Sequence, residues 1–532
     1  MSLQGVFKPA ESPFFGILEQ NRLPSRHEKK AIQELLGEKT AHLAQLKSQV
    51  PKRRFGRKPR VPRELRAELA YTRRWLEFHR PLVSPWRQLP AEIMSEIFLF
   101  TLEPRGNGNH RYLWHTSTDE DGPWDDDRAG TLLVCEICSA WRAIALKTPG
   151  LWNTLSIRLF TTRKARPQWV STWLERSRSS PVHLQLLWNS EASTSAINWV
   201  MGVFARHFHH TAELLINGLH SRHPQIMHAN HEAYYPKLTF KPSLASLDAP
   251  LLSTLIVRLP QGSVWKWMQA ICHAAPRLTY LTTSHSPLDL FPLANVTKLT
   301  WARRVPMSQI FQMFENLPPN LTHVNIHVND ADFPSSTKSR LGMKSITNLG
   351  LTSHQHLGEF LEQAEFPSVV NLRCNDILTW PSQPFHSFLS RSSCALTVLA
   401  FHHCYISAPE LVDCLQHSAC TALESLTVQR CPLRNAEVFL RYLTYRGPEH
   451  PGGNRNLRTI ALHDIRAPDG LFADMVESRC LSCGPPGPVR LTEIAFSLVD
   501  MVKPRDRSND WKRLQELERT VKELKIVWPA RA

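Results

Sequence analysis

The sequence predicts an α/β solenoid, in which a strand-plus-helix unit repeats and its short strands stack into one parallel sheet. Residues 395–406 and 422–433 share the spacing L-x-x-L-x-L-x-x-C-x-L, with other apolar residues at some leucine positions. Residues 321–329 repeat the pattern with asparagine at the cysteine position. Between copies, segments such as 407–419 have apolar residues at helical spacing. A small all-α domain is expected before this array.

The period of the unit identifies the kind of repeat. Its second apolar position recurs at nearly even intervals from Val324 to Leu426, and then at two longer intervals. The shorter intervals fall within the period of a leucine-rich repeat, about 20–29 residues. We therefore expect an irregular array of such repeats over residues 180–532, closed by a C-terminal cap at 509–528. The recurring positions are Val324, Leu349, Leu372, Leu399, Leu426, Ile460 and Ile494.

The cysteines predict a reducing compartment. There are eleven, an odd number, and they are scattered between Cys135 and Cys483 without the spacing of a disulfide framework or a zinc site. Cys404 and Cys431 hold the ninth position of the repeat, where we expect each thiol to bond turn backbone groups from inside. We therefore interpret them as structural, and we expect no metal site.

Two helical segments precede the array. Residues 1–26 are expected to lack structure, and residues 27–82 form a helical lead-in that a basic linker divides. Apolar residues recur near a 4,3 spacing on both sides of this linker, but over too few heptads for a stable coiled-coil dimer. We expect these helices to pack against each other or against the next domain. The apolar positions are Ile32, Leu36, Leu43, Leu46, Val50, Leu65, Leu69 and Leu76.

The stretch LPAEIMSEIFLF, residues 89–100, predicts a helix with more apolar surface than one neighbour can cover. Proline is tolerated at the first helical position, so the helix is expected to begin at Pro90. Its apolar residues cover more than half of the circumference, which indicates either burial in a large core or a second partner. A second helix has Val134, Cys138, Trp141 and Ala145 at 4,3,4 spacing and ends before Pro149.

These two helices carry a resemblance to a known family. The motifs L-P-x-E-I with I-F, L-V-C-x-x-C-x-x-W-R-x-I-A and P-x-L-W resemble an F-box of the type abundant in mushroom-forming fungi, over residues 83–160 with an inserted acidic loop at 103–130. The resemblance implies a three-helix domain that binds the Skp-type adaptor of a cullin-RING ubiquitin ligase. The adaptor-binding residues that it implies are Leu89, Pro90, Ile93, Ile97, Phe98, Leu133, Val134, Cys138, Trp141, Leu151 and Trp152.

The formal net charge is +16, and its densest cluster lies in the linker at residues 52–60. This cluster is consistent with a nuclear localisation signal, with a solvated linker or with contacts to nucleic-acid phosphates. No apolar run is long enough to span a membrane and no secretion signal is present, so we expect an intracellular protein, cytoplasmic or nuclear or both. The cationic residues of the cluster are Lys52, Arg53, Arg54, Arg57, Lys58 and Arg60.

The sequence has no motif for nucleophilic catalysis, phosphate binding, zinc hydrolysis or dinucleotide binding. The histidine-rich stretches 206–210 and 401–405 lack a third ligand at fixed spacing, which favours solvent-facing or ligand-contacting roles over metal binding. We therefore expect a substrate receptor that is not an enzyme and has no cofactor, whose partners are an adaptor, a cullin and an unidentified target protein. The alternative is a basic, nucleic-acid-associated repeat or scaffold protein; nucleic acid is not the favoured partner.

Overall fold

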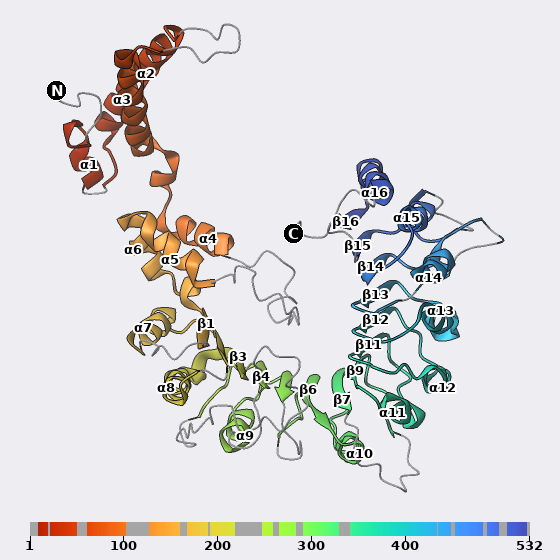
Figure 1. Ribbon diagram of the computed structural model, residues 1–532. Helices are drawn as coiled ribbons and strands as arrows, with labels where there is room; N and C mark the ends of the chain where they lie inside the picture. The colour runs from red at the N-terminus through yellow and green to blue at the C-terminus, as the bar shows by residue number, and fades with distance from the viewer. Residues whose placement is uncertain are drawn as a thin grey trace. The chain divides into compact units, whose positions relative to one another are not determined.

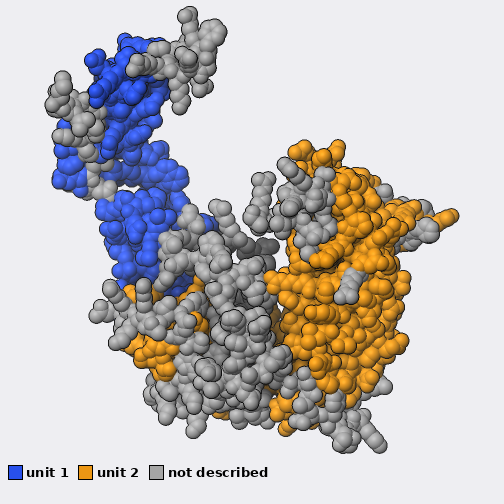
Figure 2. Space-filling view, viewed as in Figure 1, with its two compact units in different colours: residues 1–156, 171–180 blue, residues 157–170, 181–532 orange. Residues whose placement is uncertain are grey.

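The chain forms two compact units in the computed structural model, shown in Figure 2: residues 1–156 with 171–180, and residues 157–170 with 181–532. The first unit is helical, and the second contains most of a long sheet. The residues that the structure describes are 9–19, 22–50, 61–102, 127–159, 167–189, 192–218, 247–258, 265–283, 291–328, 341–433, 435–447, 449, 453–481, 487–498 and 508–528.

Two long helices form the core of the N-terminal part, α2 (Arg26–Ser48) and α3 (Arg63–His79). Ser25 and Glu28 form a capping box that fixes the start of α2, because each side chain accepts a hydrogen bond from the backbone N–H of the other. The two helices pack against each other, which is one of the two arrangements that we expected. Their shared buried residues are Leu43, Leu46, Leu69, Trp75 and Leu76. The basic cluster at residues 52–60 lies outside the described residues.

The expectation that residues 1–26 lack structure is wrong for residues 9–19. A 3-10 turn, η1 (Pro9–Glu11), and a short helix, α1 (Phe15–Glu19), occupy this segment, and Ile17 is buried against Ile32 and Leu82. Short apolar segments gain structure from such contacts rather than from helical propensity, so periodicity did not indicate them.

A buried hydrogen-bond chain holds this segment in place. His79 is fully buried and its ring stacks on Trp75 at 3.8 Å between centroids. Nδ1 lies 2.7 Å from the carbonyl oxygen of Trp75, which can only accept, so Nδ1 carries the proton. Nε2 lies 2.6 Å from the hydroxyl oxygen of Ser12 and accepts its proton when the ring is neutral. Burial of the ring favours the neutral imidazole over the charged form.

Acidification is expected to weaken this contact. Burial lowers the pKa of His79 and outweighs the opposing hydrogen bond to Trp75. Below about pH 6.5 the unfolded chain gains a proton that folded His79 does not bind, so stability falls as the pH drops from the unfolded pKa toward the folded one. The free energy of unfolding, measured from about pH 7.5 to about pH 5, should fall more steeply for the native chain than for His79→Phe. Equal slopes would contradict a neutral, buried His79.

The next three helices are α4 (Ala91–Leu102), α5 (Asp127–Ile137) and α6 (Ser139–Lys147). Pro90 precedes α4 instead of beginning it, and its carbonyl accepts the first helical hydrogen bond. The single second helix that we expected is two helices, because Cys138 is extended (φ −160°, ψ 167°) and its Sγ accepts from the backbone N–H of Trp141. Residues 127–130 of the expected acidic loop belong to α5, and residues 103–126 lie outside the described residues.

Short 3-10 turns flank the three helices: η2 (Arg80–Val83) and η3 (Pro85–Gln88) before α4, and η4 (Pro149–Trp152) after α6. Gly150 allows η4 to approach α4 closely, because a Cβ there would lie 2.9 Å from a methyl carbon of Leu99. The Arg142 side chain joins α6 to the end of α5 by donating to the carbonyl of Cys135 at 2.8 Å. These contacts join α4, α5, α6 and the turns beside them into one small body, which we call the helical unit.

Among the described residues, fourteen strands form one sheet, in the order β1-β2-β3-β4-β5-β6-β7-β9-β11-β12-β13-β14-β15-β16. The neighbouring strands from β2 to β16 pair in parallel, which confirms the predicted α/β solenoid-like fold. The bounds are β1 (Thr154–Leu159), β2 (Val182–Trp188), β3 (Thr211–Gly218), β4 (Thr254–Arg258), β5 (Tyr280–Thr283), β6 (Lys298–Val305), β7 (His323–Val328), β9 (Asn348–Thr352), β11 (Asn371–Asn375), β12 (Val398–His402), β13 (Ser425–Gln429), β14 (Thr459–Ile465), β15 (Glu493–Leu498) and β16 (Lys525–Val527).

Helices follow most strands, and Figure 1 shows α10 to α16 along one side of the sheet. A separate two-stranded pair joins β8 (Leu341–Gly342) to β10 (Ala364–Glu365). The helices and turns are α7 (Pro167–Ser177), α8 (Thr194–Ala205), η5 (Phe208–His210), α9 (Trp265–His273), α10 (Met307–Glu315), α11 (Leu357–Gln363), α12 (Ser382–Ser392), α13 (Ala408–Gln416), η10 (Ser418–Cys420), α14 (Ala436–Leu443), α15 (Leu471–Leu481) and α16 (Ser508–Thr520).

The recurring apolar positions of the sequence form one continuous row inside the sheet. Each is the register partner of the next, and all seven are at most 1% exposed. The sheet begins earlier than the expected boundary at residue 180, since β1 lies within residues expected to be helical. Leu155, Ile157 and Leu159 alternate with more exposed residues along β1, a period-2 pattern typical of a strand.

Cys404 and Cys431 have the structural role that their position predicted. The backbone N–H of Cys404 donates to Sγ of Cys431, and Sγ of Cys404 donates to the carbonyl of Cys374 at 3.3 Å. Both thiols are buried. They satisfy backbone groups of adjacent turns, so replacing either would leave buried polar atoms unpaired.

Candidate protein-binding surfaces

Helix α4 presents two apolar stripes. Met94 and Phe98, four residues apart, are at most 2% exposed and face the core of the helical unit. Ile93 and Phe100 are 48% and 70% exposed, with half-buried Ile97 between them. Positions i, i+4 and i+7 share one side of a helix, so this second stripe forms an exposed apolar ridge.

Helix α5 has a similar division. Val134 and Cys135 are buried, whereas Leu133 and Ile137, four residues apart, are 60% and 54% exposed. Leu132 is also exposed. Single exposed apolar side chains are ordinary on protein surfaces, but several on one small unit make it a candidate for an interaction site. We call Ile93, Phe100, Leu132, Leu133 and Ile137 the apolar ridges.

The eleven residues implied by the resemblance fall into two groups. Leu89, Pro90, Ile93, Ile97, Leu133, Cys138 and Trp141 are exposed or half-buried. The remaining four are at most 7% exposed and pack inside the unit, so they support its core and do not present a surface; they are Phe98, Val134, Leu151 and Trp152.

Trp86, Phe100, Leu132 and Ile137 are exposed apolar residues that the resemblance did not indicate. The seven-residue spacing of Phe100 from Ile93 and the four-residue spacing of Ile137 from Leu133 were the available signals. Trp86 lies in η3, outside a helical period, and nothing in its sequence surroundings marks it.

The sheet offers a second, polar surface. Side chains alternate between the two faces of a strand, so the residues that alternate with the buried row share the other face. One register row of this face consists of half-buried polar residues: His327, Thr352, Asn375, His402, Gln429, His463 and Ser497. Burial lowers the pKa of His402 and of His463. This row is therefore rich in hydrogen-bonding groups and low in charge near neutral pH.

Equivalent positions at or near the carboxyl ends of four neighbouring strands repeat one backbone conformation. Asp376, His403, Arg430 and Asp464 have φ between 52° and 64°, in the left-handed region that residues other than glycine seldom adopt. Repetition at equivalent positions indicates that the array imposes this backbone conformation. It places charged and imidazole side chains along this edge of the sheet, in positions that the repeat pattern leaves variable.

Two exposed apolar residues lie beside that edge. Tyr405 is 60% exposed and Leu378 is 48% exposed. They follow adjacent strands at equivalent positions, and the backbone N–H of Tyr405 donates to the carbonyl of Ile377 at 2.8 Å. Tyrosine beside polar and charged groups is the composition that protein-binding hot spots favour.

The histidine-rich stretches are placed differently from each other. His207 lies just before η5 and does not share a helix face with His210, which is its edge-on neighbour at 5.3 Å between ring centroids. His402 and His403 lie at the end of β12, as expected. Among the described residues no group of three or more histidine, cysteine or acidic side chains is arranged to hold a metal ion.

None of the described helices has both the length and the apolar content needed to cross a lipid bilayer. The candidate surfaces are an apolar one on the helical unit and a polar one on the sheet.

In comparisons with known proteins, no family model matches the chain and no curated protein is significantly similar to it.

Proposed function

We propose that the chain is a non-catalytic substrate receptor of a ubiquitin ligase of the Skp-cullin-F-box type. The helical unit α4–α6 binds a Skp-type adaptor, which connects it to a cullin, and the repeat sheet binds a target protein. The apolar ridges are the observation that carries this proposal. They include Ile93 and Leu133, two of the residues that the F-box resemblance implies as adaptor contacts.

The energetics of the helical unit support a partner at this surface. Fully burying one leucine or isoleucine side chain contributes about 1.5–3 kcal/mol, so the ridges would contribute several such increments on binding. A partner with a complementary apolar groove would remove these side chains from water, and this transfer would stabilise the complex. The core of the unit consists of other residues, among them Met94, Phe98 and Trp152, which are at most 2% exposed.

The sheet suits the other half of the role. Its polar row and its strand-end turns vary between repeats, while the buried row keeps the scaffold constant. A receptor of this kind supplies no chemistry and accelerates ubiquitin transfer by holding its target close to the charged enzyme. The identity of the target depends on the variable side chains, foremost the strand-end residues and Tyr405.

Changing Ile93 and Leu133 together to aspartate is expected to weaken adaptor binding by a hundredfold or more. Both side chains are exposed, so the fold should persist, while two apolar contacts are lost and two charges would be buried on binding. Titration of the purified chain with a purified Skp-type adaptor measures the affinity, and thermal melting reports the fold.

The matched control is Leu481→Asp, because Leu481 is a 64% exposed leucine on α15, outside the helical unit. It should bind the adaptor like the native chain. Binding of native strength by the Ile93/Leu133 variant, or no binding by the native chain, would overturn the F-box assignment.

A further inference from the structure

Helix α3 has a face of exposed arginine side chains. Residues 1–90 contain nineteen lysines and arginines but only eight acidic residues, so most of the formal net charge of +16 lies in this part of the chain. Within α3 itself every lysine or arginine position is an arginine, and all four side chains are exposed. We call these residues the arginine face: Arg63, Arg66, Arg73 and Arg74.

The arginine face points away from α2. At about 100° per residue, its four positions fall within a sector of about 100° of the helix circumference. This sector lies opposite Leu69, Trp75 and Leu76, which are buried in the core that α3 shares with α2. Figure 1 shows the two helices side by side, as this shared core requires. The arginine face is therefore not needed for packing the two helices together.

The arginine face has few partners within the described part of the chain. None of its four guanidinium groups forms an ion pair there, and only Arg66 has a side-chain hydrogen bond, of 3.5 Å to the carbonyl of Val61. The one acidic residue in the same sector of α3 is Glu77, which is also exposed. By contrast, Lys30 of α2 pairs with Glu34 one turn further on. The guanidinium groups of α3 are thus available to an anionic partner.

The arrangement works against the stability of the isolated helix. Arg63 and Arg66 lie in the first turn of α3, at the positive end of the helix dipole, and like charges three residues apart repel each other. Pro62, which precedes the helix, has no side chain that can cap its first N–H groups. Phosphate groups at this end would compensate for both effects, because they accept hydrogen bonds from arginine and from N–H groups of a helix N-terminus.

We propose that the arginine face binds the phosphate backbones of duplex DNA. Arg63 and Arg73 are ten residues apart in one helix, which is about 15 Å along its axis. The major groove of B-DNA is about 12 Å wide and admits a helix, so one arginine pair can reach each of the two backbones that border it. Exposed Ala70 lies between the two pairs and is small enough to allow a close approach.

The chemistry of the face also favours phosphate in DNA. Arginine presents a planar fork of N–H donors that matches phosphate oxygens, whereas lysine would supply only a point charge. Contacts to phosphates do not read base identity, so we expect binding without sequence preference. The major groove of duplex RNA is deep and narrow, which favours DNA over RNA. This activity is separate from the adaptor-binding role proposed above.

Fluorescence anisotropy of a labelled DNA duplex, titrated with the full chain at several salt concentrations, tests the proposal. The native chain should bind, and its affinity should fall as salt rises. Arg63→Gln with Arg66→Gln, and separately Arg73→Gln with Arg74→Gln, should each weaken binding about tenfold or more at low salt. Each pair should also lower the slope of log affinity against log salt by roughly two, since two phosphate contacts are lost. Glu77→Gln should strengthen binding several-fold, because it removes the acidic residue of the sector.

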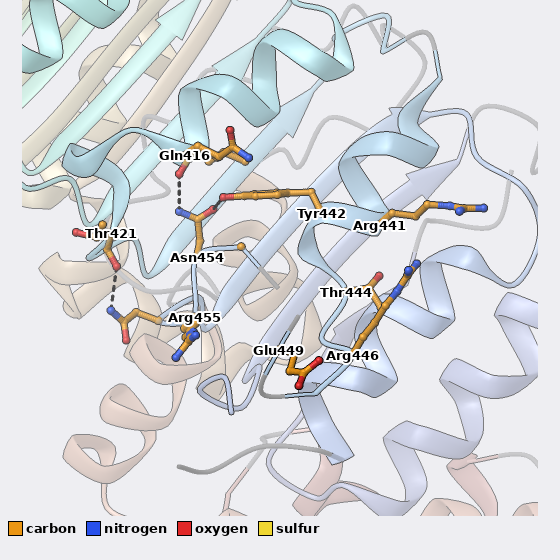
Figure 3. Close-up of a pocket in the computed structure, with 12 residues that line it drawn as sticks. Gln416, Thr421, Arg441, Tyr442, Thr444, Arg446, Glu449, Asn454 and Arg455 are labelled. Carbon is orange, nitrogen blue, oxygen red and sulfur yellow. Dashed lines mark hydrogen bonds between the residues drawn. The ribbon is translucent and has the colours of Figure 1, made fainter. Parts of the chain in front are cut away.

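The matched control for non-specific attraction by the strongly basic chain is Arg446→Gln with Arg455→Gln, which removes the same charge. Both side chains are exposed, and they line a hollow with Gln416 and Thr444 at the carboxyl ends of α13 and α14 (Figure 3). The helix dipole disfavours an anion at such ends, so this variant should keep the native affinity.

Four outcomes would overturn the proposal. They are no duplex binding by the native chain, native affinity in both arginine-face variants, equal weakening by the control, and tighter binding to vesicles of phosphatidylserine and phosphatidylcholine than to the duplex. Glutamine is about as good a helix former as arginine, so circular dichroism melting should be unchanged in every variant. Adaptor binding should also be native, because α3 lies outside α4–α6, so failure of this proposal and failure of the F-box assignment are distinguishable.

Discussion

Trp152→Ala is expected to unfold the helical unit. The Trp152 ring is fully buried, its Nε1–H donates to the carbonyl of Ala145 at 2.8 Å, and its edge contacts Trp173 at 4.7 Å between centroids. Truncating a buried aromatic side chain costs about 3–5 kcal/mol. The carbonyl of Ala145 would also lose one of its two hydrogen bonds and keep only the one from the backbone N–H of Thr148. Hydrogen exchange of α4–α6, followed by mass spectrometry, should show loss of protection in these helices.

Trp86→Ala is the matched control, because Trp86 is 60% exposed and belongs to the same unit. Substitutions at such surface positions usually change stability by less than about 0.5 kcal/mol. Native protection in Trp152→Ala would mean that the ring is not part of the core. Trp152→Ala should also abolish adaptor binding by unfolding the unit, whereas Trp86→Ala, whose side chain lies outside the apolar ridges, should retain it.

The repeats between β7 and β15 were predictable because their sequence period follows from the packing of one strand on the next. Leu399 and Leu426 must occupy the same depth in adjacent strands, and the interval between them suffices for one strand, one helix and two turns. The same requirement places Ile460 and Ile494 in the row, although the intervals there are longer. A longer connection between strands changes the loops and leaves the register of the buried row unchanged.

The first strands were not predictable in the same way. The residues that continue the row before Val324 are Leu184, Leu214, Leu255, Leu281 and Leu299, at irregular intervals. Without a constant period, a short apolar run is equally consistent with a buried helix segment. β3 illustrates this, because its unbroken run of buried residues, Leu214 to Gly218, lacks the alternation that marks a half-buried strand.

The candidate adaptor surface shows a different limit. In α4 the residues at 93, 97 and 100 and those at 94 and 98 form neighbouring stripes, and both stripes are apolar. A helical period predicts which residues share a stripe but not which of two apolar stripes faces the core. Which stripe faces the core depends on where α5, α6 and η4 pack against α4. The close approach of Gly150 in η4 to Leu99 in α4 is one such packing contact. Sequence reasoning therefore mixed core residues such as Phe98 with surface residues such as Ile93.

The C-terminal unit is expected to be indispensable to the end of the array. Leu514, Leu517 and Ile526 are at most 5% exposed, so α16 and β16 cover apolar surface of the preceding repeat. Asp510 Oδ1 accepts from the backbone N–H of Ala473 at 2.7 Å, and Arg513 pairs with Glu477 at 2.6 Å. The parallel pairing of β16 with β15 also covers the backbone edge that would otherwise end the sheet.

Deleting residues 508–532 should destabilise the last repeats by roughly 5 kcal/mol or more, because several apolar side chains lose their cover at about 1.5–3 kcal/mol each. The exposed edge of β15 should then promote aggregation, since an unpaired strand edge is a template for pairing between chains. Light scattering and denaturant unfolding measure the two effects. Deletion of residues 529–532 alone, which retains α16, β16 and Trp528 with its 4.4 Å ring contact to Trp511, should leave both unchanged. If the longer deletion left a monomeric chain of native stability, α16 and β16 would not be a cap, because a solenoid unit buries its apolar face only against its neighbours.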